Sequence, residues 1–263
     1  MIYLVGGYGF IGSAFARLFK RRGLEFRIIG RNDYEKLAGL SCDVLINANG
    51  NSKKFLADRD TLAEFDASVK SVLMSLNSFR FARYVHLSSG DVYPNQSQPE
   101  LTIEDAPILV EHQSRYGLHK YLAEQLVRNY AADWLVIRMG GFIGPNMKKN
   151  AIFDMLTNAP IWLTPDSELQ YIHTDTAAEM IWQLVENGIN RQIVNLGAEG
   201  VVQIGALYRK IGAKSNFHPD ARQIRFELSL SKLQSLLGRP LPSAEDEVTR
   251  FVNEWRLKET GEG

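Results

Sequence analysis

Short apolar runs alternate along the chain with longer stretches in which apolar residues recur every three or four positions. A short apolar run bounded by turn residues is typical of a buried strand, whereas the longer spacing indicates an amphipathic helix. Strands that alternate with helices predict right-handed βαβ units and a parallel sheet. The predicted strands are Ile2 to Val5, Glu25 to Ile29, Val44 to Asn47, Tyr84 to Leu87 and Trp134 to Arg138.

This alternation predicts an α/β fold, a doubly wound parallel Rossmann sheet with a small C-terminal substrate-binding lobe. After Gly144 and Pro145 the pattern becomes less regular, and further prolines separate shorter elements. We therefore expect residues 1–145 to form the Rossmann domain. Residues 146–263 are expected to form mainly the substrate-binding lobe, and some of its elements can return to the Rossmann sheet.

A glycine-rich loop, GGYGFIG from residue 6, follows the first predicted strand at once and opens a helix. Gly6 allows a tight turn, Gly9 lets the backbone approach a pyrophosphate, and Gly12 lets the helix pack closely on the sheet. The alternative is an ordinary glycine-rich turn between a strand and a helix. We predict that Gly6, Gly9, Phe10, Ile11 and Gly12 bind a dinucleotide.

The end of the second predicted strand bears on the choice of dinucleotide. Arg31 and Asp33 lie about 20 residues beyond the glycines, where a Rossmann fold selects its adenosine ribose. Arg31 suits the 2′-phosphate of NADP, whereas Asp33 can accept from the ribose hydroxyls of NAD. We favour NADP over NAD and take Arg31 as a cofactor ligand; a solvated loop charge is the alternative.

Tyr116 and Lys120 are four positions apart at the start of a helical pattern, so the phenol and the ammonium share one face. A tyrosine that works near neutral pH needs its pKa lowered by about three units, and an adjacent lysine helps to supply that shift. Lys120 can also hold the nicotinamide ribose. On its own the spacing also arises by chance on amphipathic helices.

A hydroxyl pair extends the chemistry of this tyrosine and lysine. The strand from Tyr84 to Leu87 runs directly into Ser88 and Ser89, and ligands of open α/β sheets bind at such strand ends. A hydroxyl there can hydrogen-bond a substrate carbonyl or alcohol while the tyrosine moves the proton. We take Ser88 as a turn residue and Ser89 as catalytic, together with Tyr116 and Lys120.

Further motifs occur in a fixed order after the glycine loop. They are LSSGDVYP from Leu87, YGLHK from Tyr116, IRMGGFIGP ending at Pro145, YIHTDTAA from Tyr171 and LSLSKLQSLLG near the end. Over nearly its full length the chain resembles the extended short-chain dehydrogenase/reductases. This is the NAD-dependent epimerase/dehydratase family, which acts mainly on nucleotide sugars.

The resemblance implies a reductase or epimerase that acts on a sugar alcohol or ketosugar, nucleotide-activated, in carbohydrate biosynthesis. It makes Tyr116 the acid/base, Lys120 its activator and a cofactor ligand, and Ser89 the hydroxyl that orients the substrate. By the same analogy, the helical patterns from Asp60 to Phe79 and from Ser114 to Tyr130 pair across a homodimer interface. A non-catalytic dinucleotide sensor is the rival class, but such proteins often lose the tyrosine or the lysine.

Three departures from the family pattern qualify this resemblance. The segment between Arg31 and Cys42 has room only for a short turn or helix, so the usual third strand is expected to be missing. Sequence-related dehydratases carry an acidic pair after the catalytic hydroxyl, where this chain has Gly90 and Asp91, which argues against dehydration. An arginine near the nucleotide diphosphate is replaced by the stretch from Glu168 to Gln170. The substrate-binding candidates are Ser89, Asp91, Lys148 and Gln170.

Composition excludes several other classes. The 30 basic and 30 acidic side chains cancel, so no overall field favours nucleic acid or an anionic membrane. The single cysteine, Cys42, rules out an internal disulfide, and His173 and Asp175 have no further ligands near them in sequence, so no metal site is expected. No apolar stretch approaches the ~20 residues of a membrane span, and we expect a cytoplasmic protein.

Overall fold

The computed structural model describes residues 1–51 and 53–259; the side chains of Arg31 and Glu259 lie outside that description. The chain divides into two compact units. The sheet unit comprises residues 1–94, 104–139 and 178–195, and the lobe unit comprises residues 95–103, 140–177 and 196–263.

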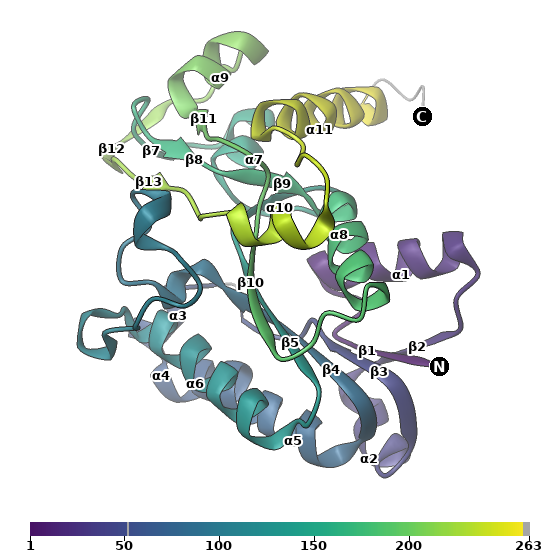
Figure 1. The fold of residues 1–263 in the computed structure, drawn as a ribbon. Helices are drawn as coiled ribbons and strands as arrows, with labels where there is room; N and C mark the ends of the chain where they lie inside the picture. Colours follow the sequence, from purple (N-terminus) through teal and green to yellow (C-terminus); the bar gives the residue numbers. More distant parts are fainter. Residues whose placement is uncertain (52, 260–263) are drawn as a thin grey trace. The chain divides into compact units, whose positions relative to one another are not determined.

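The sheet unit is built around a six-stranded sheet with the strand order β10-β5-β4-β3-β1-β2 (Figure 1). The four pairings among β2, β1, β3, β4 and β5 are parallel. The predicted α/β fold with a Rossmann sheet is thereby confirmed, and all five predicted strands are present. Their bounds are β1 Ile2–Val5, β2 Phe26–Ile29, β3 Ser41–Asn47, β4 Arg80–Ser89 and β5 Trp134–Met139, and the sixth is β10 Gln192–Leu196.

Strand β2 forms one edge of this sheet. Between β2 and β3 the chain makes only the 3-10 segment η1, Arg31–Asp33, and the one-turn helix α2, Tyr34–Leu37. Within the described residues there is thus no strand outside β2, as the short spacing to Cys42 predicted.

Helices cover both faces of the sheet. On one face lies α1, Phe10–Arg22. The centre of its Phe19 ring is 4.9 Å from the centre of the Trp182 ring of α8, Thr174–Glu186. On the other face lie α5, Ser71–Ser78, and α6, Arg115–Tyr130. The helix that precedes α5 is not regular: α4, Thr61–Phe65, continues into a π-helical segment η2, Asp66–Lys70. A short helix, α3 Leu56–Arg59, comes before α4.

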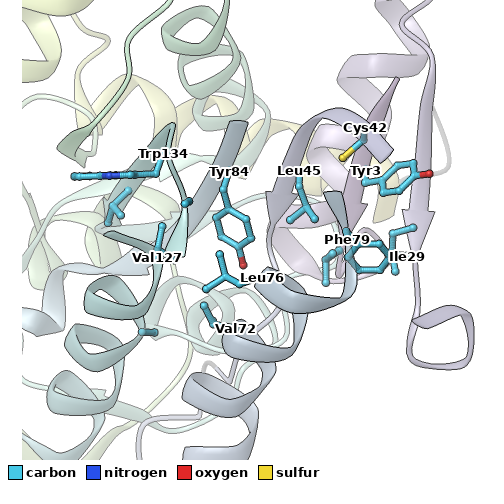
Figure 2. Packing of buried hydrophobic residues seen from close by; sticks show 14 residues of the cluster. Tyr3, Ile29, Cys42, Leu45, Val72, Leu76, Phe79, Tyr84, Val127 and Trp134 are labelled. Carbon is cyan, nitrogen blue, oxygen red and sulfur yellow. The ribbon is translucent and has the colours of Figure 1, made fainter. Parts of the chain in front are cut away.

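The core between the sheet and helices α5 and α6 is mainly apolar. Figure 2 shows Tyr84 pointing from the sheet toward the helix that carries Val72 and Leu76. Its buried hydroxyl lies 2.5 Å from Ser75 Oγ and accepts from Asn47 Nδ2 at 2.7 Å. A buried phenol therefore has partners within the core, which avoids the cost of an unpaired polar group.

The lobe unit contains short strands in three small sheets. Helix α8 begins in this unit and ends in the sheet unit. No helix of the described chain is long and apolar enough to cross a membrane. The remaining elements of the unit are η4 Pro99–Leu101, β6 Gly141–Ile143, α7 Ala151–Leu156, β7 Ile161–Leu163, β8 Glu168–Leu169, β9 Tyr171–His173, β11 Val202–Gln203, α9 Ile204–Ile211, β12 Phe217–Arg222, β13 Arg225–Phe226, α10 Ser231–Leu237 and α11 Ala244–Glu259.

Candidate active site

The glycine loop joins β1 to α1 through a tight turn. Gly6 has φ +77°, and the backbone N–H of Gly9 donates to its carbonyl oxygen at 2.9 Å. A Cβ on Gly12 would lie 2.2 Å from the same oxygen. No side chain would fit there without moving the backbone, so Gly12 lets α1 start against the turn.

The start of α1 suits an anionic ligand. Gly9 is the N-cap residue and makes no side-chain capping hydrogen bond. The first amides of a helix lack intrahelical partners and carry its positive dipole end. A Cβ on exposed Gly9 would meet only Gly6 O within 4 Å, at 3.1 Å. This end of the loop is therefore not crowded by the protein, and the cradle from Gly6 to Gly12 fits a dinucleotide pyrophosphate.

The candidate ribose selectors lie just beyond β2. Asp33 Oδ2 accepts from the backbone N–H of Gly30 at 3.0 Å, which ties the end of β2 to η1. One carboxylate oxygen of Asp33 thus has a structural partner. The side chain of Arg31 is outside the described part of the chain.

The tyrosine and the lysine come from the first two turns of α6. Ser114 caps this helix, accepting from Gly117 N at 3.0 Å. A Cβ on Gly117 would lie 2.2 Å from the carbonyl oxygen of Asp91. Only glycine therefore lets α6 pack this closely on the 3-10 segment η3, Gly90–Val92, which follows β4.

Tyr116 is buried, and its hydroxyl donates to the backbone carbonyl of Asn51 at 3.0 Å. Burial and the charges of Asp91 and Glu64 raise its pKa above the usual value, while a hydrogen bond with Ser89 acts in the opposite direction. The sequence led us to expect a lowered pKa. In the protein as described, desolvation exceeds the effects that lower it, and the phenol is protonated at neutral pH.

Lys120 is buried one turn later, with its Nζ 5.4 Å from the centre of the Tyr116 ring. A Cβ on Gly50 would lie 2.9 Å from this Nζ, so the ammonium lies against the chain that follows β3. Burial lowers the pKa of Lys120 to about 8, and the charges of Glu64 and Asp91 partly offset that effect.

Ser89 is the last residue of β4, and its Oγ donates to Asp91 Oδ2 at 2.8 Å. The backbone N–H of Asp91 donates back to this Oγ at 3.2 Å. Asp91 Oδ1 also forms an ion pair with Lys54 Nζ at 2.7 Å. The structure thus brings Ser89, Asp91, Tyr116 and Lys120 together, and adds Lys54, which the sequence analysis had not selected.

Ser88 is not the turn residue that the sequence indicated: it lies within β4, and the strand alternation turns its side chain away from that of Ser89. Its buried Oγ donates to Glu124 of α6 at 2.6 Å, and Glu124 also binds the guanidinium of Arg138. This network fixes α6 to β4 and β5. No pattern in the sequence pointed to it.

The lobe unit holds the other predicted substrate contacts. Lys148 is exposed in the loop between β6 and α7. Gln170 is buried, and both ends of its amide pair with the main chain of Leu228, at 3.2 and 3.4 Å. His173 is also buried; its Nδ1 accepts from Asp175 N. Within the described residues, no three His, Cys, Asp or Glu side chains are grouped so as to hold a metal ion.

The fold and the site together define a dinucleotide-dependent enzyme of the Rossmann class, with a glycine loop at β1 and polar side chains at the carboxyl ends of the strands. The model of the NAD dependent epimerase/dehydratase family matches residues 2–197. The chain therefore belongs to this family. A search of curated protein sequences finds no match.

Solved structures of three different kinds of enzyme share the fold. A UDP-galactose 4-epimerase is 20% identical with a TM-score of 0.78, covering 98% of this chain and 99% of that one. A dTDP-4-dehydrorhamnose reductase from Bacillus anthracis in complex with NADP is 15% identical, with a TM-score of 0.78 and coverage of 96% and 97%. An NAD-dependent NDP-hexosamine 5,6-dehydratase is 16% identical, with a TM-score of 0.78 and coverage of 97% and 97%. At these identities the likeness concerns the fold, which does not select the reaction.

Proposed function

We propose that this protein is a cytoplasmic NAD(P)-dependent reductase or epimerase that acts on a sugar alcohol or ketosugar through Ser89, Tyr116 and Lys120. The observation that carries the proposal is the meeting of these three side chains at the end of β4 and the first turn of α6. Ligands of open α/β sheets bind at such strand ends.

The cofactor is proposed to be NADP in preference to NAD. The loop from Gly6 to Gly12, including Phe10 and Ile11, would hold the pyrophosphate, and Arg31 would contact the 2′-phosphate. When bound, the nicotinamide supplies or accepts the hydride. Similar structures were solved with NAD and with NADP, so the fold accommodates either.

The raised pKa of Tyr116 supports a role as proton donor. In the reductive direction the phenol gives its proton to the substrate oxygen, and the Ser89 hydroxyl hydrogen-bonds the same oxygen. The Lys120 ammonium stabilises the phenolate that results. In the oxidative direction the same groups act in reverse, with Tyr116 taking up the proton.

A nucleotide-activated sugar is the proposed substrate. Similar structures are named for UDP-galactose and were solved with UDP-glucose, which supports this class. Asp91, Lys148 and Gln170, with Ser89, are the proposed contacts. Gly90 replaces the first carboxylate of the family's dehydratases, so we rank dehydration lower.

A homodimer is also proposed, through the helices α4 to α6. Leu62, Met74 and Leu122 of these helices are large apolar side chains that are exposed, and covering such side chains favours association. Sedimentation that shows only monomer at micromolar concentration would remove this part of the proposal.

Binding of the dinucleotide is the first test. Purified protein is titrated with NADPH and NADH by fluorescence, and any nucleotide released on denaturation is identified. Dissociable NADPH supports a reductase, whereas tightly held NAD points to an epimerase. Binding of neither nucleotide contradicts the proposal.

Tyr116→Phe then separates an enzyme from a non-catalytic dinucleotide sensor. We expect turnover of an active ketosugar to fall by about 10²–10⁴-fold while dinucleotide affinity changes little. Tyr121→Phe, on the same helix, is the matched control and should leave turnover unchanged. Dinucleotide binding without turnover on any sugar nucleotide would favour the sensor.

A further inference from the structure

Glu64 is a carboxylate that the sheet unit buries completely. It lies in α4, and its side chain has no accessible surface. Its neighbours on the helix, Ala63 and Phe65, are exposed, so the burial is specific to the face that carries Glu64. A buried carboxylate is costly to ionise unless donors or a positive charge compensate it.

Two donors reach this carboxylate from opposite sides. Ser68 Oγ hydrogen-bonds Oε1, and His119 Nδ1 contacts Oε2. An ionised carboxylate only accepts, so His119 donates from Nδ1, and a neutral imidazole suffices for that. Ser68 belongs to the π-helical segment η2, in which both Ser68 and Val69 are buried. Segments of this type often occur at functional sites.

His119 places the carboxylate beside the proposed catalytic turn, because it lies between Tyr116 and Lys120 on α6. Ser68 and His119 thus hold the Glu64 carboxylate against α6, at the residue directly before Lys120. The charge of Glu64 acts on Lys120 and also on Tyr116. Glu64 is thus a charged partner of the site that does not touch the reacting groups.

The charges around Lys120 come from every element that packs on it. Asp91 of η3 contributes a second negative charge, and His86 of β4 is buried and neutral. Glu124, one turn further along α6, is paired with Arg138. Asp91 is itself bound by Lys54. Glu64 is therefore the buried carboxylate near Lys120 whose hydrogen-bond donors do not need to carry charge.

We propose that Glu64 is a positioning residue whose buried carboxylate, held by His119 and Ser68, is the counter-charge that keeps the Lys120 ammonium protonated. The proposal rests on the proposed function for its catalytic meaning. A charged Lys120 stabilises the Tyr116 phenolate, and a neutral one does not. Glu64 would thus extend the pH range in which the pair works, although its own charge opposes ionisation of Tyr116 directly.

Glu64→Gln tests the charge with little change in shape. The pKa of Lys120, about 8 in the native protein, should fall by about one unit when the opposite charge is removed. The probe is ¹⁵N NMR of protein labelled at lysine Nζ, titrated with pH, with Lys120→Met to assign the signal. Glu64→Asp keeps the charge and should restore most of the native midpoint.

The matched control is Asp66→Asn, at the first residue of η2. Asp66 is exposed and pairs with Lys70 four residues away, so its loss removes the same charge outside the core. In this variant the titration midpoint of Lys120 should equal that of the native protein. An unchanged Lys120 midpoint in Glu64→Gln, or an equal shift in Asp66→Asn, would overturn the proposal.

A second variant covers failure of Glu64→Gln to fold. His119→Phe removes the side chain that holds the Glu64 carboxylate against α6, so the Lys120 midpoint should fall again. An unchanged midpoint there also counts against the proposal. The NMR readout needs no cofactor or substrate, so failure of NADPH and NADH to bind would refute the proposed function while the Lys120 midpoints still decide the role of Glu64.

Discussion

Two buried carboxylates meet different partners at α6: Glu124 belongs to this helix, and Glu64 contacts it from α4. Glu124 receives the Arg138 guanidinium, with Nη2 at 2.8 Å and Nε at 3.1 Å, and the Ser88 hydroxyl at 2.6 Å. Within the described residues, the Glu64 carboxylate receives only a hydroxyl and an imidazole. The first carboxylate is paired with a guanidinium, whereas the second is held by a hydroxyl and an imidazole and acts on the pKa of Lys120.

This difference separates a structural pair from a functional one. A bidentate ion pair in the core fixes geometry, because breaking it leaves an uncompensated charge. A carboxylate held by neutral donors instead shifts the proton equilibria of its neighbours. One turn of α6 therefore anchors the helix to the sheet, and the turn before it carries the proposed chemistry.

The largest expected effect comes from Arg138→Met. Glu124 would remain buried without its cation, and the free energy of unfolding should fall by about 3–5 kcal/mol. Urea denaturation followed by circular dichroism measures this. The double variant Arg138→Met/Glu124→Gln should recover most of the loss, and a single-variant cost below about 1 kcal/mol would show that the pair is not structural.

His86 extends the comparison to a buried base. Within the described residues neither of its ring nitrogens has a hydrogen-bond partner, and burial, then the charge of Lys120, lower its pKa from 6.5 to about 3. The unfolded state therefore binds the proton first as the pH falls, and stability is lost from about pH 6.5 down to about pH 3. Between about pH 7 and pH 4.5 the loss should reach about 2.5 kcal/mol.

The variant His86→Leu isolates this contribution. The variant lacks the group that takes up the proton. Between pH 7 and pH 4.5 its free energy of unfolding should therefore rise, relative to that of the native protein, by about 2.5 kcal/mol. A constant difference across this range would mean that His86 is not the group that titrates. His112→Leu, at a residue outside the core, is the matched control and should show no such trend.

Lys120→Met should have an effect opposite in sign to that of Arg138→Met. The folded-state pKa of Lys120 is lowered from 10.5 to about 8, so its charged form costs stability below pH 8. We expect the variant to be more stable at pH 7 by about 1 kcal/mol. Above pH 8 the difference should change by about 1.4 kcal/mol for each pH unit, so that the native protein becomes the more stable one by about pH 9. A destabilised variant at pH 7 would contradict this.

The last comparison distinguishes the two serine donors. Ser88→Ala and Ser68→Ala each remove one hydroxyl from a buried carboxylate. Glu124 keeps its guanidinium, so Ser88→Ala should cost about 1 kcal/mol, whereas Ser68→Ala should cost about 2 kcal/mol. Thermal unfolding of the two variants under identical conditions measures the difference. Equal costs would show that the carboxylates depend on their donors alike.

Much of the architecture followed from local patterns. The five strands and the glycine loop at β1 were predictable because short apolar runs and the glycine spacing are local properties. The four-residue spacing of Tyr116 and Lys120 likewise placed both on one helical face. The choice of Ser89 over Ser88 agrees with the partner that Ser88 has in Glu124, although the catalytic roles stay predictions.

The π-helical segment and the buried carboxylates were not predictable in this way. The helical pattern from Asp60 to Phe79 gave no sign of an irregular segment. In the structure η2 interrupts the helix, and Ser68 within it is buried. A glutamate within a helical pattern is normally assigned to the solvent face. Glu64 departs from that rule because His119, 55 residues later, supplies its donor.

The pKa of Tyr116 was also expected in the wrong direction. Sequence spacing identified the lysine that lowers it, but not the burial or the charges of Asp91 and Glu64 that raise it. Desolvation depends on everything that packs around a group, and no local spacing reports that.

The sequence by itself therefore determined the order of strands and helices, the glycine loop and the membership of a family, because these depend on residues near one another in the chain. The tertiary structure alone decided which charges are buried, which of them are neutralised, and which remain to act on the Tyr116 and Lys120 pair. Those outcomes depend on contacts between segments that are distant in sequence, and on the low polarity that packing creates around them.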